Sequence, residues 1–251
     1  MLSKNELKET ASLLQKKYRK EKSKFIVEGR KLIYEALTSG FKCELIVSTN
    51  HFNEIASDFF EEKKVKSIRH EAVKQIEFEK LSDTKTPQGI VGVFQKQNSP
   101  KQNYSSNIIV ALENISDPGN LGTILRNSDW FGFRQIILSE NCAEIFNPKV
   151  IRSSAGSVFH LEIFEEENFV ESLLALKKKN YKIFSSDLAG ENIYGINSKE
   201  KCVIVFCNEG NGPTNELLSI SDSKITIPKI GKAESLNVAS ASAIILSELS
   251  R

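Results

Sequence analysis

The sequence predicts an α/β protein made of two modules, and three observations support this fold class. Short apolar runs typical of strands alternate with helical patterns over residues 25–94. The pattern is lost over residues 98–107, NSPKQNYSSN, which have the composition of a linker. Alternation then resumes at Ile108. We therefore expect a small N-terminal α/β domain at residues 1–97, a linker at 98–107 and a second α/β domain at 108–251.

The first module begins with an amphipathic helix. Leu7, Ala11, Leu14 and Tyr18 recur at helical spacing, and the helix is expected to end near Lys22. The elements expected after it are a strand at 25–27, a helix at 30–38, a strand at 43–47, a helix at 53–61, a strand at 65–68, a helix at 71–80 and a strand at 90–94.

The second module opens with a buried strand at 108–112, a polar loop and a helix at 120–131. In α/β proteins, ligands bind at such loops because they follow the carboxyl ends of parallel strands. The elements expected after it are a strand at 135–138, a loop bearing Asn147 and Pro148, a strand at 161–164, a helix at 168–179, strands at 181–185, 202–206 and 224–227, and a final helix at 235–249.

Composition narrows the class of protein. Hydrophobic residues make up 40% of the 251 residues, which is enough for a core, and no apolar run approaches the roughly 18 residues of a membrane span. The N-terminus lacks the apolar core of a signal peptide, so we expect a cytoplasmic protein. The four cysteines form no C-x-x-C pair, which predicts reduced thiols and no bound metal.

Charge is unevenly distributed along the chain. The formal net charge is only +2, yet the first 31 residues carry ten lysines and arginines against four glutamates. Such a surplus suits a phosphate backbone, and it is equally typical of a solvated helix face. The candidate RNA contacts in this segment are Lys17, Arg19, Lys24 and Arg30.

Several common enzyme motifs are missing from the sequence. There is no G-x-x-x-x-G-K-[ST] loop, and Gly210 and Gly212 lack the third glycine of G-x-G-x-x-G. No G-x-S-x-G elbow is present, and the three histidines are far apart in the sequence. Kinases, GTPases, common dehydrogenases and serine hydrolases are therefore disfavoured.

Three polar loops follow predicted strands of the second module. The loops contain NISDPGNLGTILR at 114–126, FCNEGNGP at 206–213 and IPKIGKAESLNVASA at 227–241. In this order and spacing they resemble the three signatures of the SpoU, or TrmH-like, RNA ribose methyltransferases. KYRKEKSKFIVEGRKLIYEAL and LSDTKTPQGIVGVF are similar to the substrate-binding domain that precedes the catalytic domain in one branch of that family.

This resemblance implies a SPOUT-type parallel sheet flanked by helices, a C-terminal trefoil knot, S-adenosylmethionine as cofactor and a homodimer. It also implies transfer of a methyl group to a ribose 2′-hydroxyl of RNA, ribosomal RNA rather than transfer RNA because of the extra domain. The alternatives are tRNA 2′-O-methylation, an RNA-binding protein of this fold without turnover, and a nucleotide-binding reductase. Small residues of the last helix, such as Ala243 and Ser247, suit a knot, a dimer interface or ordinary helix packing.

The resemblance also assigns residues to the site. The cofactor contacts that it implies are Cys207, Asn208, Gly210, Gly212, Ile227, Pro228, Ile230, Gly231, Ser235, Leu236 and Val238. The catalytic residues that it implies are Asn120, Arg126, Glu209, Ser235 and Asn237. Read without the family, Ser235 is a helix N-cap, Asn120 a turn residue and Arg126 a solvated charge.

Arg126 cannot act as an ordinary base because a guanidinium keeps its proton up to a pH of about 12. We expect it to hold the phosphate beside the target ribose and to stabilise the developing alkoxide, while the proton leaves through a transient neutral arginine, Glu209 or water. Arg152, in NPKVIRSSAGSVF, is a further candidate for a phosphate contact or for a structural role. The chain departs from the family pattern at Cys207, Lys229, Asn127 and Ser128.

Overall fold

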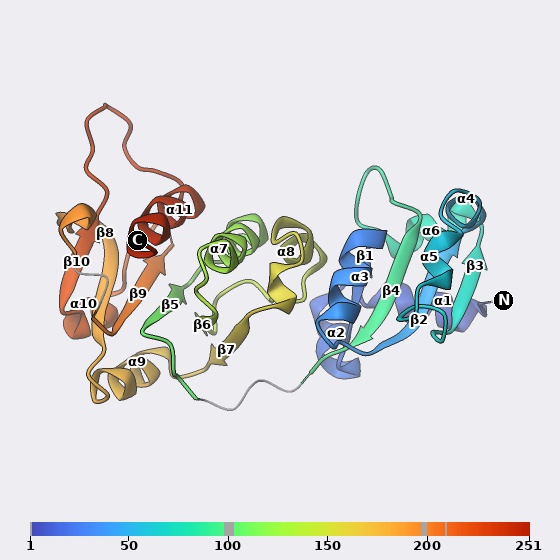
Figure 1. The fold of residues 1–251 in the computed structure, drawn as a ribbon, viewed down its shortest axis with the longest axis horizontal. Helices are drawn as coiled ribbons and strands as arrows, with labels where there is room; N and C mark the ends of the chain where they lie inside the picture. Colours follow the sequence, from blue (N-terminus) through green and yellow to red (C-terminus); the bar gives the residue numbers. More distant parts are fainter. Residues whose placement is uncertain (1, 98–102, 197–199, 209) are drawn as a thin grey trace. The chain divides into compact units, whose positions relative to one another are not determined.

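The computed structural model describes residues 2–97, 103–196, 200–208 and 210–251 (Figure 1). The chain forms two compact units. Unit 1 contains residues 1–98 and 144–159, and unit 2 contains residues 99–143 and 160–251. The segment 144–159 follows a strand of unit 2 in the chain and yet packs within unit 1, which the order of the sequence does not reveal.

Unit 1 is built on a mixed sheet of four strands in the order β1-β4-β2-β3. β4 runs antiparallel to β1 and β2, whereas β3 runs parallel to β2. The strands are β1 (Lys24–Glu28), β2 (Cys43–Thr49), β3 (His70–Val73) and β4 (Ile90–Gln95). The helices are α1 (Lys4–Ser12), α2 (Lys16–Lys22), α3 (Arg30–Thr38), α4 (Asn50–Ile55), α5 (Asp58–Glu61), α6 (Gln75–Phe78) and α8 (Pro148–Ser153).

The structure corrects several elements expected in unit 1. The opening helix is two helices, because Gln15 is extended at the start of α2. The expected strand at 65–68 is wrong: these residues form turns, and the strand is His70–Val73, which pairs with Ile46–Thr49. The expected helix at 71–80 shrinks to α6 and a 3₁₀ turn at Glu79–Leu81. Pairing with β2 decides this region, and a short apolar run cannot predict it.

Unit 2 is built on a sheet of six strands in the order β10-β8-β9-β5-β6-β7, with every neighbouring pair parallel. This confirms the predicted parallel α/β sheet. The strands are β5 (Ile108–Glu113), β6 (Gln135–Ser139), β7 (Glu162–Glu166), β8 (Lys182–Asn192), β9 (Cys202–Cys207) and β10 (Ser223–Thr226). The helices are α7 (Pro118–Trp130), α9 (Phe169–Lys177), α10 (Asn215–Ile220) and α11 (Val238–Leu249).

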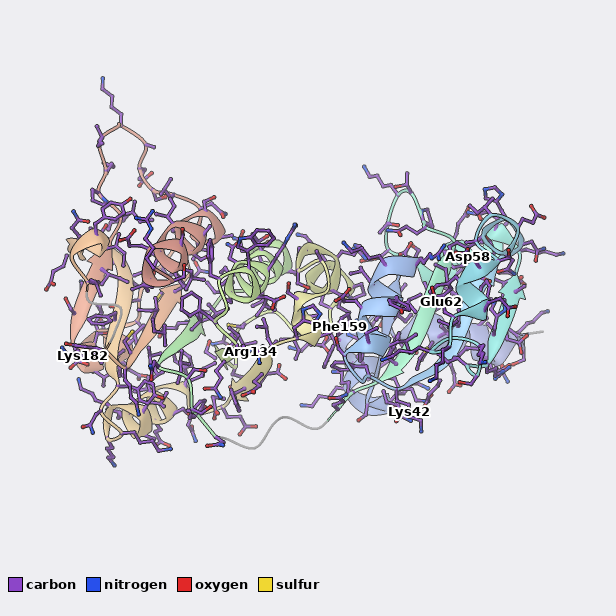
Figure 2. All side chains as sticks on the ribbon, in the orientation of Figure 1. Lys42, Asp58, Glu62, Arg134, Phe159 and Lys182 are labelled. Carbon is purple, nitrogen blue, oxygen red and sulfur yellow. The ribbon has the colours of Figure 1, made fainter. Side chains whose placement is uncertain are left out.

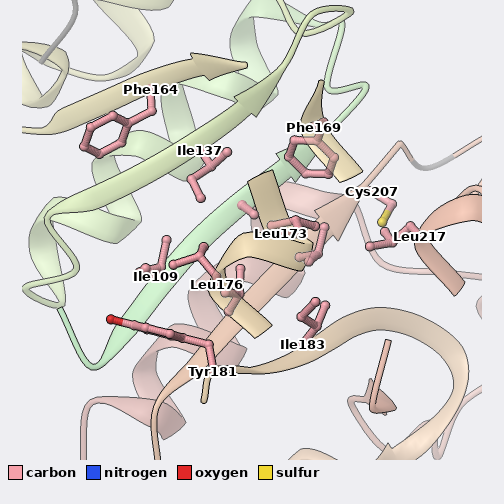
Figure 3. Close-up of a cluster of buried hydrophobic side chains, with 13 residues drawn as sticks. Ile109, Ile137, Phe164, Phe169, Leu173, Leu176, Tyr181, Ile183, Cys207 and Leu217 are labelled. Carbon is pink, nitrogen blue, oxygen red and sulfur yellow. The ribbon is translucent and has the colours of Figure 1, made fainter. Parts of the chain in front are cut away.

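Helix α9 covers the hydrophobic core on one face of this sheet (Figure 3). Leu173 and Leu176 are fully buried in one cluster with Ile109 and Ile137, and each such leucine contributes about 2 kcal/mol. Val110, which alternates with these positions on β5, is also buried. A parallel sheet covered on both faces brings the carboxyl ends of its strands to one edge, where the loops of the candidate site begin.

Two short helices were not expected from the sequence. Asn147 caps α8 by accepting a hydrogen bond from the Lys149 amide at 2.9 Å, and Thr214 caps α10. Six residues are too few to show a helical period, so these helices depend on their caps and on packing. No helix among the described parts of the chain is long and apolar enough to cross a membrane.

Candidate active site

The first loop of the site links β5 to α7. Asp117 is the N-cap of α7, and its carboxylate accepts a hydrogen bond from the Asn120 amide at 2.8 Å. Pro118 occupies the first turn, where its missing N–H costs nothing. The helix therefore begins two residues before the predicted start, and its first turn fixes the position of Asn120.

The first and third loops meet at two asparagines. The side-chain amide of Asn237 donates a hydrogen bond to the side-chain oxygen of Asn120 at 3.1 Å, across 117 residues of sequence. The Asn237 oxygen accepts from the amides of Ala239 and Ser240, so Asn237 is the N-cap of α11. Asn120 and Asn237, two of the predicted catalytic residues, are thus held side by side at the ends of two helices.

A second contact fixes the two helices against each other. The side-chain amide of Asn127 on α7 donates to the Ala239 carbonyl and to the Ser242 hydroxyl on α11, both at 2.9 Å. The Asn127 amide thus bonds helix to helix, where an apolar side chain would only pack.

Arg126 lies on α7, the same helix as Asn120, and is exposed. Among the described residues its guanidinium has no hydrogen-bond or ion-pair partner. An exposed guanidinium at the edge of the site remains available to an anion such as a phosphate.

The second loop begins where β9 ends. The Asn208 side-chain oxygen accepts from the Gly210 amide at 2.8 Å, and the Gly212 amide donates to the Asn208 carbonyl at 2.9 Å. Gly212 has a φ of 62°, which favours glycine. The Asn208 side chain also donates to the Asn114 carbonyl at 3.1 Å, which connects this loop to the first. Glu209, a predicted catalytic residue, lies outside the described residues.

Cys207 ends β9 and is buried. Burial raises the pKa of its thiol, and the neighbouring Glu113 carboxylate raises it further. A thiol in this state stays protonated and is a poor nucleophile. The Cys207 side chain therefore has a structural role in the site, and its backbone leads into the second loop.

The third loop, residues 227–237, corrects one expectation. The final helix begins at Val238 rather than Ser235, so Asn237 and not Ser235 is its cap. Ser235 is exposed, and residues 228–236 make no hydrogen bond to another part of the described chain. Ile230 is fully exposed and Leu236 is 48% exposed. Figure 1 shows this loop projecting from the unit between β10 and α11. The cofactor contacts predicted at Ile230, Ser235 and Leu236 stay predictions.

The structure places the predicted RNA contacts of unit 1 in different environments. Arg19 is a correction: it is 2% exposed, and its guanidinium bonds the Glu144 carboxylate and the Leu13 carbonyl, so it cannot reach a phosphate. Lys17 is exposed, with its ammonium 5.8 Å from the centre of the Tyr18 ring.

The remaining three cations are held by carboxylates at the surface of unit 1. Lys24 pairs with Glu44 at 2.5 Å, and Arg30 pairs with Asp58, which Figure 2 labels, at 2.6 Å. Arg152 makes a two-pronged pair with Asp83 at 2.5 and 3.0 Å. Each could reach a phosphate only by exchanging one anion for another.

A hollow of about 570 Å³ in unit 2 does not belong to this site. Its lining comes from residue 104 and from residues 165–179, and it includes the four carboxylates of Glu165, Glu166, Glu167 and Glu171. None of its lining residues comes from the three loops. These four carboxylates would repel a phosphate backbone, and the hollow therefore does not suit RNA.

The fold and the joined loops define an α/β protein with a ligand site at the carboxyl edge of a parallel sheet. Comparison with known families gives its membership. The model of the SpoU rRNA Methylase family matches residues 107–247, and the model of the MRM3-like substrate binding domain matches residues 4–92. The chain belongs to the SpoU rRNA methylase family.

Individual relatives agree with this assignment along nearly the whole chain. The chain is 32% identical to the 23S rRNA (guanosine(2553)-2′-O)-methyltransferase RlmP of Bacillus subtilis, over 97% of this chain and 95% of the relative. It is 30% identical to an AdoMet-bound rRNA methyltransferase from Sinorhizobium meliloti, with a TM-score of 0.83 and coverage of 99% and 96%. A crystal structure of an RNA 2′-O ribose methyltransferase aligns with a TM-score of 0.86 at 25% identity, with coverage of 99% and 96%.

Proposed function

We propose that this protein transfers a methyl group from S-adenosylmethionine to a ribose 2′-hydroxyl of ribosomal RNA. The observation that carries the proposal is the hydrogen bond between Asn120 and Asn237. It joins the first and third signature loops at the carboxyl edge of the parallel sheet, where this fold places its ligands. The rRNA methyltransferases to which the chain is similar support the same substrate class.

The residues around the second and third loops fit S-adenosylmethionine. A Cβ atom added at Gly212 or Gly231 would meet nothing within 4 Å, so both backbones are open to a ligand. Ile230 and Leu236 offer uncovered apolar surface, and the amides of residues 229–236 in the third loop offer hydrogen bonds to polar groups. We assign cofactor contacts to Cys207, Asn208, Gly210, Gly212, Ile227, Pro228, Ile230, Gly231, Ser235, Leu236 and Val238. When bound, the cofactor supplies the sulfonium methyl group that is transferred.

The residues on the acceptor side position the ribose. Asn120 and Asn237 orient polar groups at the ends of α7 and α11, and the exposed Arg126 binds the neighbouring phosphate and stabilises the developing alkoxide. The hydroxyl proton leaves to water, to Glu209 or through a transient neutral Arg126. Ser235, on the third loop, completes the set of proposed catalytic residues.

Unit 1 supplies binding to RNA outside the reacting nucleotide. We assign this role to the N-terminal domain at residues 1–97, joined through a linker at 98–107 to the methyltransferase domain at 108–251. Lys17 is exposed on α2, and Lys24, Arg30 and Arg152 join it once their carboxylate partners are exchanged for phosphates. The match of residues 4–92 to a substrate binding domain supports this division.

A homodimer through the C-terminal domain and a trefoil knot near the C-terminus are also part of the proposal. Trp130 on α7 is 80% exposed and Ile244 on α11 is 36% exposed, and these two helices pack against each other. The small residues Ala243 and Ser247 on α11 permit the close backbone approach that such an interface needs. Four free cysteines suit a cytoplasmic location.

Two experiments test the function. Separated ribosomal and transfer RNA pools are incubated with the protein and methyl-labelled S-adenosylmethionine, and the label is expected in a ribose of ribosomal RNA. Label in transfer RNA alone would favour the tRNA alternative, and cofactor binding without label in any RNA would favour a silent RNA-binding protein. Mapping the 2′-O-methyl mark that disappears when the gene is deleted then identifies the nucleotide.

A further inference from the structure

Glu113, the last residue of β5, is a buried carboxylate without a cation. Glu113 is 4% exposed, and no lysine or arginine among the described residues pairs with its side chain. A buried carboxylate without a cation is costly unless hydrogen-bond donors surround it. The donors around Glu113 therefore show what this carboxylate holds in place.

Hydrogen bonds to Glu113 come from both ends of the second signature loop, to its carboxylate at the far end and to its main-chain carbonyl at the near end. At the far end, Thr214 donates its amide to Oε2 at 3.0 Å and its hydroxyl to Oε1 at 2.6 Å. At the near end, the Asn208 amide donates to the Glu113 carbonyl at 3.2 Å, and Glu113 is the register partner of Cys207 on β9. One residue of β5 thus fixes the entry and the exit of the loop between Asn208 and Thr214.

The exit contact also orients helix α10. The Thr214 hydroxyl that donates to Glu113 accepts a hydrogen bond from the Leu217 amide at 3.2 Å, as an N-cap does. The carboxylate, the hydroxyl and the helix amide form one chain of hydrogen bonds that runs from the sheet to the helix. These contacts hold the loop between two rigid elements, in addition to the hydrogen bonds that its own glycines donate to Asn208.

We propose that Glu113 is a positioning residue that holds the described part of the second loop, residues 208 and 210–213, in the conformation that binds S-adenosylmethionine. The inference rests on the proposed function. Glu113 does not itself contact the cofactor: it acts through the loop, by fixing the backbone that the cofactor meets. Prior alignment reduces the ordering cost of binding, so loss of the contact lowers affinity for the cofactor more than it slows methyl transfer at saturation.

Two isosteric variants remove this contact in different ways. Glu113→Gln presents an NH₂ group to one of the two Thr214 donors, and Thr214→Val removes the hydroxyl while it keeps the shape of the side chain. Thr214→Ser keeps the hydroxyl and is the matched control. Calorimetric titration with S-adenosylmethionine and with S-adenosylhomocysteine measures affinity, and hydrogen exchange of residues 207–217 in the cofactor-free protein measures the order of the loop.

We expect Glu113→Gln and Thr214→Val to lower the affinity for both ligands about tenfold, the loss typical of one hydrogen bond to a charged group. Both variants should also speed hydrogen exchange in the loop. Thr214→Ser should stay within about twofold of the wild type, and kcat at saturating cofactor should change little. Affinity for RNA should be unchanged, because the variants leave unit 1 and Arg126 intact.

Three results would overturn the inference. Wild-type affinity in both variants would show that the contact is not needed. Weaker binding of S-adenosylmethionine alone, with S-adenosylhomocysteine unaffected, would show that the carboxylate acts on the sulfonium charge instead. An equal loss in Thr214→Ser would show that the hydroxyl is not the link, and this comparison decides even where Glu113→Gln does not fold. Failure of the wild type to bind either ligand would instead refute the proposed function.

Discussion

Replacing Glu144 by glutamine would leave the Arg19 guanidinium of unit 1 buried without an anion. The two side chains are 2% and 8% exposed, and Arg19 donates to Glu144 Oε2 from Nε at 2.7 Å and from Nη2 at 2.5 Å. Lys96 donates to the other carboxylate oxygen at 2.6 Å. Breaking a buried pair on one side costs about 3–5 kcal/mol. Because the Leu13 carbonyl still accepts one Arg19 N–H at 2.8 Å, we expect the lower end, about 3 kcal/mol.

Native-state hydrogen exchange followed by mass spectrometry locates this loss. A change of about 3 kcal/mol speeds exchange roughly a hundredfold in peptides of β1 and β4, while peptides of β5 and β9 in unit 2 serve as the internal reference. Glu9→Gln is the control variant, because its partner Lys22 forms an exposed pair, and it should leave exchange unchanged.

The same pair predicts a dependence on pH. Burial opposes ionisation of Glu144, but hydrogen bonds from Arg19 and Lys96 outweigh it and hold the pKa below its ordinary value of 4.5. A carboxylate with a lowered pKa stabilises the fold above that ordinary value and loses the contribution as the pH falls through the folded pKa. The difference between wild type and Glu144→Gln should stay constant from pH 7 to 5 and shrink below about 4.5. A constant difference down to pH 3.5, or one under about 1 kcal/mol at pH 7, would refute the reasoning.

Three further predictions concern the site and its surroundings. Arg126→Lys keeps the charge but loses the two-pronged guanidinium, and it should lower kcat about a hundredfold with cofactor affinity unchanged; near wild-type turnover would make the guanidinium unnecessary. Asn237→Ala removes the cap of α11 and should cost about 1 kcal/mol by urea unfolding and also lower kcat, whereas Ser240→Ala, one turn along, should change neither. Trp130→Glu should convert a dimer to a monomer in sedimentation velocity, and an unchanged sedimentation coefficient would exclude α7 from the interface.

The strands and helices that the sequence predicted well are those with long apolar patterns. The buried runs of β5 and β9 and the period of α9 are visible in the chain because burial on both faces leaves few polar residues. The short helices α8 and α10 and the strand β3 were missed, since four to six residues carry too little pattern and depend on their partners.

The candidate site was predicted in part, and the reasons differ from residue to residue. The motif order identified Asn120 and Asn237, but only the tertiary structure joined them, since a contact across 117 residues leaves no local pattern. Glu113 carried one signal, a charge at the end of a buried strand, whose meaning required Thr214 to be seen beside it. The basic charge of the first 31 residues could not show that Arg19 is buried, because its partner Glu144 lies 125 residues away.

The sequence by itself determined the class of fold, the family and the three loops of the site, because apolar periodicity and signature motifs are local properties of the chain. Only the tertiary structure decided which element joins which. It placed residues 144–159 in unit 1, where Phe146 stacks on Phe25 with ring centres 4.2 Å apart, and it gave the cap of α11 to Asn237 rather than Ser235. The physical reason is that a buried charge or an open helix end takes its partner from whatever the fold brings near, at any distance along the chain.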